Sequence, residues 1–97
     1  MFVQDQLAAL DGLSARSMFG GYGLYAGEIF FGIVHDGRLY LKTDAQSRRE
    51  HEAAGMGPFR PRPGQILQRY WEVPAEVLED AETLTAWARR ALRCADG

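Results

Sequence analysis

Hydrophobic residues near the start of the chain recur at helical spacing. Val3, Leu7 and Leu10 stand at positions i, i+4 and i+7, which places them on one face of an α-helix. Gly12 follows, and glycine commonly ends a helix in a left-handed conformation. The pattern therefore predicts a short first helix that Gly12 terminates.

Residues 16–43 have a pattern that is typical of strands. The run 28–34, which contains Phe30 and Phe31, is apolar at both sets of alternating positions. Such a run is typical of a strand with both faces covered. We therefore expect a central strand here, within a group of about three antiparallel strands.

A tight hairpin is predicted directly after this strand. Asp36 and Gly37 both tolerate the positive φ that a type I′ turn requires. In the strand that follows, two leucines alternate with Arg38, Tyr40 and Lys42. This alternation predicts a strand with one solvent-facing side.

The middle of the chain predicts a surface helix and then a loop. Asp44 is placed to cap a helix over 45–54, which Gly55 would end. The apolar face of this helix is thin, so its packing must come from neighbouring elements or from His51 turned inward. The prolines and glycines of 57–64 predict an extended loop without regular hydrogen bonding.

The remaining sequence predicts a strand over 66–73 and a long final helix. Asp80 is a good N-cap, and the last turns of the helix carry arginines that complement its dipole. The apolar positions of this helix follow the spacing of a single buried face. They are Leu84, Trp87, Ala88, Ala91 and Leu92.

Together these elements predict an α+β fold. The expected order is α-β-β-β-α-β-β-α, with a single antiparallel sheet of about five strands flanked by helices. The chain has 97 residues, of which 46% are hydrophobic and 25% charged. This balance is typical of a globular domain, so we expect one domain over 1–97.

The net charge of −2 differs from the strongly basic character of a stand-alone nucleic-acid-binding domain. The charge is uneven, because residues 31–71 carry seven basic side chains against four acidic ones, a net +3. A solvated surface explains this excess, and a patch that contacts an anion, a nucleic acid or a partner is the sharper alternative. The basic residues are Arg38, Lys42, Arg48, Arg49, Arg60, Arg62 and Arg69.

A cytoplasmic location is expected from two features. The sequence contains neither a secretion signal nor an apolar run long enough to span a membrane. Its one cysteine, Cys94, cannot form an internal disulfide. We assign Cys94 no functional role.

Three patterns that suggest chemistry fail on closer inspection. Residues 21–26 match a loose dinucleotide-binding pattern, but strand-like residues follow where a helix is needed. His51 and Glu52 begin a helical zinc motif whose second ligand position is occupied by Gly55. No nucleophile elbow accompanies the serines. We therefore expect no catalytic residue, no cofactor and no metal.

The segment 16–25 is the densest unusual string, with three glycines among aromatic residues. It predicts a kinked strand that another backbone or surface approaches closely. Its residues 18–25, Met-Phe-Gly-Gly-Tyr-Gly-Leu-Tyr, resemble the signature of the TfoX N-terminal domain. Further blocks that resemble this family follow in order at 36–42, 53–59, 70–74, 79–80 and 87–88.

The resemblance to the TfoX/Sxy family covers about residues 2–92 and implies both a fold and a function class. It implies one antiparallel sheet flanked by helices in a secretion-chaperone-like arrangement. It also implies a bacterial positive regulator of DNA-uptake competence genes, acting with the cAMP receptor protein and without assigned catalytic residues. The expected form is a stand-alone domain without the family's separate C-terminal domain. His51 stands where relatives often have a large apolar residue.

The first functional hypothesis is a regulatory protein-binding module. Its partner would be the transcription machinery, a cAMP-receptor-type regulator or, most simply, a second copy in a homodimer. The expected contact residues are Arg16, Met18, Phe19, Gly20, Gly21, Tyr22, Gly23 and Tyr25. Two alternatives are direct nucleic-acid binding through the basic residues of 31–71, and a small-molecule pocket beside Tyr70, Trp71 and Trp87.

Overall fold

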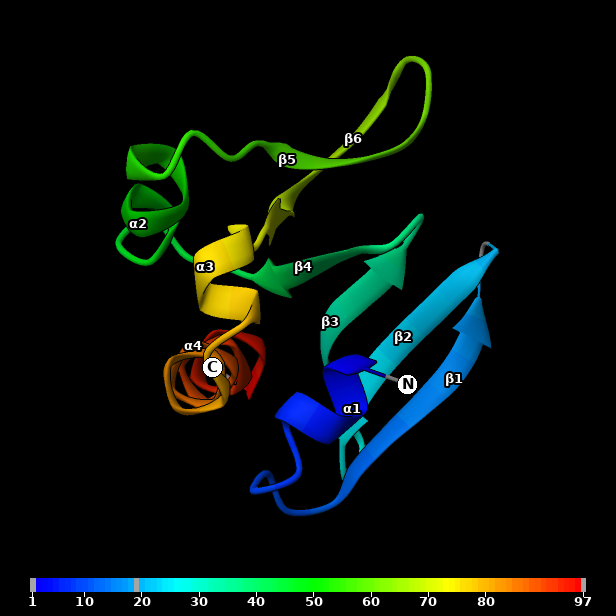
Figure 1. Ribbon diagram of the computed structural model, residues 1–97. Helices are drawn as coiled ribbons and strands as arrows, with labels where there is room; N and C mark the ends of the chain where they lie inside the picture. The colour runs from blue at the N-terminus through cyan, green and yellow to red at the C-terminus, as the bar shows by residue number, and fades with distance from the viewer. Residues whose placement is uncertain (1, 19, 97) are drawn as a thin grey trace.

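The computed structural model describes residues 2–18 and 20–96. It has an α+β fold with one open antiparallel sheet, as the sequence predicted (Figure 1). The elements in chain order are α1 (Phe2–Gln6), β1 (Leu13–Met18), β2 (Gly21–Ala26), β3 (Ile29–His35), β4 (Arg38–Lys42), α2 (Arg48–Ala53), β5 (Pro58–Arg62), β6 (Gln65–Glu72), α3 (Ala75–Leu78) and α4 (Ala81–Asp96).

The sheet has six strands in the order β1-β2-β3-β4-β6-β5. The sequence had predicted about five, because it treated 16–25 as one kinked strand. In the structure this segment belongs to two strands, which pair from Leu13↔Ala26 to Met18↔Gly21. Gly20 lies between them with a φ of 77°, a left-handed conformation that glycine adopts without steric cost. The glycines of this segment therefore allow a chain reversal.

The predicted hairpin between β3 and β4 is confirmed. Asp36 and Gly37 have φ values of 53° and 74°, and His35 pairs with Arg38 on either side of them. Positive φ at both central positions is the requirement of a type I′ turn. This turn places β3 in the middle of the sheet, paired with β2 and β4.

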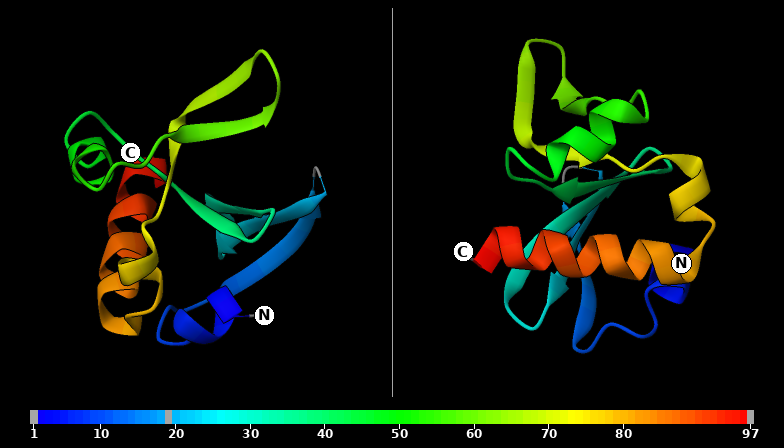
Figure 2. Two further views of the ribbon diagram at one scale, coloured as in Figure 1. Left: turned by 45° about the horizontal axis from the view of Figure 1, so that its top comes forward. Right: turned by 90° about the vertical axis from the view of Figure 1, so that its left-hand side faces the viewer.

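Helix α4 crosses one face of the sheet, with α1 beside its first turns (Figure 2, right). Leu84, Ala88 and Ala91 of α4 are buried, as their spacing predicted. They pack in a single cluster, called here the helix-side core. Its buried members are Val3, Leu7, Leu10, Leu24, Phe31, Leu39, Leu41, Val73, Val77, Leu84, Ala88 and Ala91.

Segment 58–62 corrects one prediction. Instead of an irregular loop, it forms β5, which pairs with β6 through Phe59↔Leu67 and Arg62↔Gln65, with register shifts between them. Proline cannot donate to a sheet ladder and is tolerated on edge strands. Pro58 and Pro61 stand on β5, which is the last strand of the sheet order.

Helix α2 is shorter than predicted, and its N-cap is Ser47 rather than the expected Asp44. The Ser47 N–H donates to Asp44 Oδ1 at 2.8 Å, and this bond lowers the pKa of the Asp44 carboxyl. His51 is buried, with an exposed fraction of 1%. Its ring packs against Trp87 at a tilt of 57°, with centroids 4.8 Å apart, and Nδ1 donates to the Glu72 carbonyl at 2.7 Å. His51 is therefore the inward-facing anchor of α2.

Burial of His51 makes the stability of the fold sensitive to acid. Desolvation lowers the pKa of His51, and the Arg90 charge on α4 lowers it further. The hydrogen bond to the Glu72 carbonyl and the charge of Glu50 raise this pKa, but the net shift is downward. A depressed histidine pKa means that the unfolded chain binds the proton more readily. Stability is therefore lost as pH falls below the unfolded value of about 6.5.

We expect the urea midpoint of the wild type to be clearly lower at about pH 5.5 than at about pH 7.5. His51→Gln should show a smaller decrease, because glutamine keeps a donor for the Glu72 carbonyl but does not titrate. His35→Asn leaves His51 in place and should show the same decrease in urea midpoint between these two pH values as the wild type does. An equal decrease in His51→Gln would assign the acid sensitivity to other groups.

Candidate functional site

The sheet face opposite α4 is called here the open face. In the described residues it carries a small second core, made of Ile33, Tyr40 and Phe59. The β5–β6 hairpin stands away from β1–β3, so the sheet is strongly curved (Figures 1 and 2). This curvature brings Phe59 onto Tyr40, with ring centroids 4.6 Å apart. The prediction that Tyr40 lies on a solvent-facing side of β4 is therefore wrong, because Tyr40 is buried.

Beside this second core lies a line of three partly buried rings, Tyr25, Phe30 and Tyr70. We call it the aromatic row. The ring centroids of Tyr25 and Phe30 are 5.1 Å apart, and those of Phe30 and Tyr70 are 5.5 Å apart. These spacings fall in the range of favourable aromatic contact. Strands β2, β3 and β6 thus contribute one ring each to a continuous surface.

A cation lies at each end of the aromatic row. The Arg16 guanidinium carbon is 4.4 Å from the Tyr25 ring centroid, and Lys42 Nζ is 5.5 Å from the Tyr70 centroid. Each such contact contributes about 0.5–1 kcal/mol at an exposed site. Burial raises the pKa of Tyr70, and the electrostatic effect of the nearby Tyr25 raises it further. The Tyr70 hydroxyl therefore stays protonated at neutral pH. The site presents apolar rings, two phenol hydroxyls and two positive charges.

Gly23 allows the row to pack this closely. A Cβ atom at this position would lie 2.7 Å from Met18 Sδ and 3.0 Å from the Phe30 ring. Both distances are shorter than van der Waals contact. The absence of a side chain at residue 23 thus leaves room for Met18 and Phe30 to close over its backbone from the two neighbouring strands.

A family model described as the TfoX N-terminal domain matches residues 5–95. The chain belongs to the TfoX N-terminal domain family. The resemblance inferred from the ordered sequence blocks is thereby confirmed. Protein Sxy of Escherichia coli (strain K12) is 43% identical over 44 residues. That match covers 45% of this chain and 21% of Sxy.

In this TfoX-family chain, the predicted contact residues do not share one surface. Arg16, Gly23 and Tyr25 meet on the open face, where Met18 adjoins Gly23. Tyr22 shares its strand face with Leu24, which is fully buried in the helix-side core, because side chains alternate along a strand. The remaining three are Gly20 and Gly21, at the end of the β1–β2 hairpin, and Phe19, outside the described residues.

The predicted basic set is more dispersed. Its seven residues lie on β4, α2, β5 and β6, and Lys42 is the member that contacts the aromatic row. Arg38 pairs with Glu72 at 3.7 Å, whereas Arg48 lies 5.8 Å from the Trp71 ring centroid. The other four, Arg49, Arg60, Arg62 and Arg69, are exposed.

Phe30 and Tyr70 were not predicted as members of this surface. Phe30 was expected in a strand covered on both faces, and Tyr70 beside a small-molecule pocket with Trp71 and Trp87. Trp71 follows Tyr70 on β6 and so faces the other way, and Trp87 packs on His51. The Lys42↔Tyr70 register joins Tyr70 to the row, and a single sequence holds no signal for that register.

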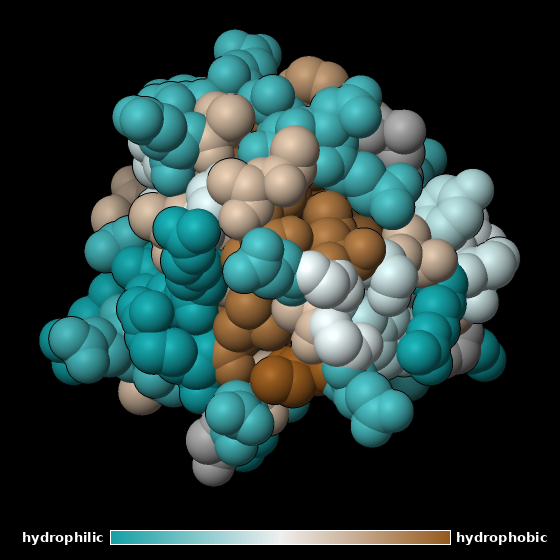
Figure 3. All heavy atoms as spheres, turned by 90° about the horizontal axis from the view of Figure 1, so that it is seen from below, coloured by the Kyte–Doolittle hydropathy of each residue, from teal (hydrophilic) through white to brown (hydrophobic). Residues whose placement is uncertain are grey.

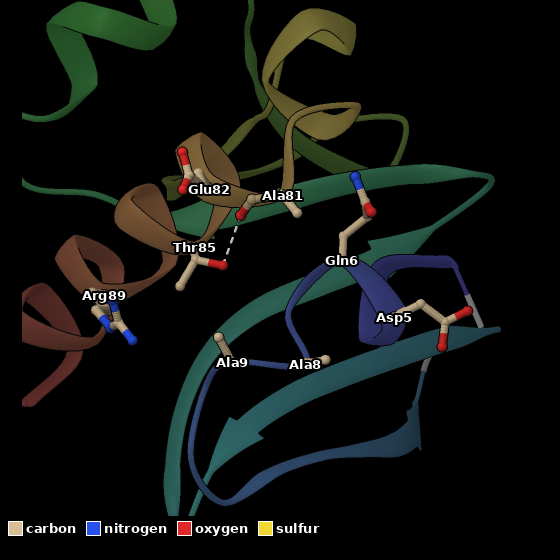
Figure 4. Close-up of a pocket in the computed structure, with 8 residues that line it drawn as sticks. All are labelled: Asp5, Gln6, Ala8, Ala9, Ala81, Glu82, Thr85 and Arg89. Carbon is tan, nitrogen blue, oxygen red and sulfur yellow. Dashed lines mark hydrogen bonds between the residues drawn. The ribbon is translucent and has the colours of Figure 1, made fainter.

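A separate groove of about 380 Å³ lies between α1 and α4 (Figure 4). Ala8, Ala9 and Ala81 give it apolar walls, and the Thr85 hydroxyl already donates to the Ala81 carbonyl at 2.7 Å. Viewed from below, the molecule shows apolar surface between hydrophilic side chains (Figure 3). The groove's lining residues include no histidine or cysteine that could serve as a base or nucleophile.

Residues 2–18 and 20–96 contain no group of three or more histidine, cysteine or acidic side chains that could hold a metal ion. The same residues contain no helix that is both long and apolar enough to cross a membrane.

Proposed function

We propose that this chain is a non-catalytic regulatory module that binds a protein of the transcription machinery through the aromatic row and its two flanking cations. The observation that supports this is the juxtaposition of Arg16, Tyr25, Phe30, Tyr70 and Lys42 on one partly exposed sheet face. Tyrosine and arginine are enriched among residues that dominate binding energy at protein interfaces. The proposed role is cytoplasmic.

The charges indicate the chemistry of the partner. Arg16 and Lys42 lie at opposite ends of the row, so a complementary segment would carry an apolar or aromatic anchor between two acidic groups. Opposite charges placed this way mainly raise the association rate and select the correct partner. A cAMP-receptor-type regulator is the partner that the family resemblance suggests.

The test compares two tyrosines on opposite faces of β2. Tyr25→Ala removes a ring of the row and the platform for Arg16, and should raise the dissociation constant by at least about tenfold. Tyr22→Ala removes a ring of equal size, 46% exposed, from the other face and should bind as the wild type does. Partners would be recovered from nuclease-treated lysate and their affinities measured by calorimetry with the purified partner. Equal losses in both variants would contradict the proposed surface.

Direct nucleic-acid binding is the second candidate, and one observation favours it. Lys42 lies beside stacked aromatic rings, and rings combined with cations are how many proteins bind single strands. Such binding would weaken steeply with salt. Two results would favour this candidate over the protein module. Nuclease treatment would abolish the recovery of partners from the lysate, and the affinity for a single-stranded oligonucleotide would fall with salt.

A further inference from the structure

The two edges of the sheet differ in how they are protected. The β5 edge carries Pro58 and Pro61, and proline blocks the addition of another strand. Strand β1 has no proline and a single charged side chain, Arg16. Within the described residues, β1 pairs with β2 alone. One edge is thus blocked, and the other offers free backbone groups.

The register of β1 and β2 identifies these free groups. The Gly27 N–H donates to the Gly12 carbonyl at 3.0 Å, directly before the Leu13↔Ala26 pair. Hydrogen-bonded and non-hydrogen-bonded pairs alternate in an antiparallel ladder. The amides that face β2 are therefore those of Ser14, Arg16 and Met18, and the outward-facing ones are those of Leu13, Ala15 and Ser17.

We infer that two copies of this chain pair antiparallel through β1, with Ala15 opposite Ala15 of the second copy. Leu13 then lies opposite Ser17 of the other copy, so the N–H and C=O of every outward-facing residue find a partner. A two-fold axis perpendicular to the sheet keeps the helices of both copies on the same side. Such a contact is self-complementary, as a closed dimer requires.

The side chains select this register over the next one. Leu13 and Ala15 pack against the helix-side core, whereas Arg16 lies on the open face. Two residues that lie opposite each other across the dimer must therefore point their side chains to the same face of the sheet. Centring on Arg16 would place two guanidinium groups opposite each other and leave Leu13 unpaired. Centring on Ala15 places each Arg16 opposite Ser14 of the other copy.

The paired sheet would be continuous across both copies and would place both aromatic rows on one face, so that a partner with two matching segments could bind both. Dimer formation itself requires neither that partner nor the aromatic row. A contact along one six-residue strand is smaller than the roughly 1,600 Å² of a standard interface. The dimer should therefore be weak and concentration-dependent.

The register is tested by cross-linking in a Cys94→Ser background. In Ala15→Cys the two Cα atoms would be about 5.5 Å apart, within reach of a disulfide. In Ser14→Cys they would be displaced along the strands by about 7 Å, beyond that reach. Covalent dimer should form at least about tenfold faster in Ala15→Cys. Equal rates in the two variants would overturn the register.

The dimer itself is tested by sedimentation from about 1 µM to about 1 mM. The wild type and Ser17→Ala should pass from monomer to dimer over this range. Ser17→Pro should stay monomeric with an unchanged circular dichroism spectrum, because the register turns the Ser17 amide away from β2. A monomeric wild type at the highest concentration, or a folded Ser17→Pro that dimerises equally well, would overturn the inference.

Discussion

Gly21→Ala should destabilise the fold by about 3 kcal/mol, the upper range for an added group in a tightly packed site. A Cβ at residue 21 would lie 2.1 Å from the Val34 carbonyl oxygen and 3.1 Å from His35 Cα. Both obstacles are backbone atoms, so no side-chain rotation can relieve the clash. Strands β2 and β3 would have to separate, and a domain of this size has only about 5–15 kcal/mol of stability in total.

Urea unfolding followed by circular dichroism measures this loss. Gly57→Ala is the matched control, because a Cβ there would meet nothing within 4 Å and should change stability by less than about 0.5 kcal/mol. If Gly21→Ala unfolds at the same urea concentration as Gly57→Ala, the backbones of β2 and β3 do not approach each other as closely at residue 21 as in this structure.

Phe59→Ala should cost about 3–5 kcal/mol, as expected for removing a buried phenylalanine ring. Phe59 is 1% exposed and packs on Tyr40, with the His35 ring centroid 5.3 Å from its own. It is also the residue that holds β5 over the open face. Its loss should release the β5–β6 hairpin as well as lower the global stability.

Hydrogen exchange separates the local effect from the global one. In Phe59→Ala, amides of β6 should exchange faster under native conditions by a larger factor than amides of α4, since the hairpin can open without unfolding the rest. Ile66→Ala, which truncates a side chain 45% exposed on the same hairpin, should leave both rates unchanged. Equal acceleration in β6 and α4 would show that the hairpin is not a separate unit.

The candidate site was partly visible in the sequence. Arg16, Gly23 and Tyr25 belong to the segment singled out for its glycines and aromatic residues, and all three adjoin or form the aromatic row. Tyr22 was expected to act with them but lies on the opposite face of β2. Strand alternation would have separated Tyr22 from Tyr25 once β2 was recognised as a regular strand.

The sequence by itself determined those features that depend on residues close together in the chain. The Asp36-Gly37 turn needs only two residues that tolerate positive φ, and the buried stripe of α4 follows from helical periodicity. The turn that Asp44 forms before α2 is similarly local, because its hydrogen-bond partner Ser47 is three residues away. Family membership also followed from the order of short motifs.

Tertiary structure alone decided what depends on strand neighbours and on the curvature of the sheet. Burial of Tyr40 requires Phe59 from another hairpin, and burial of His51 requires Trp87 from α4. The segment 58–62 became a strand because β6 supplies a partner for it. Local pattern fixes which face a residue can take, but only long-range packing fixes which side chain lies across from it.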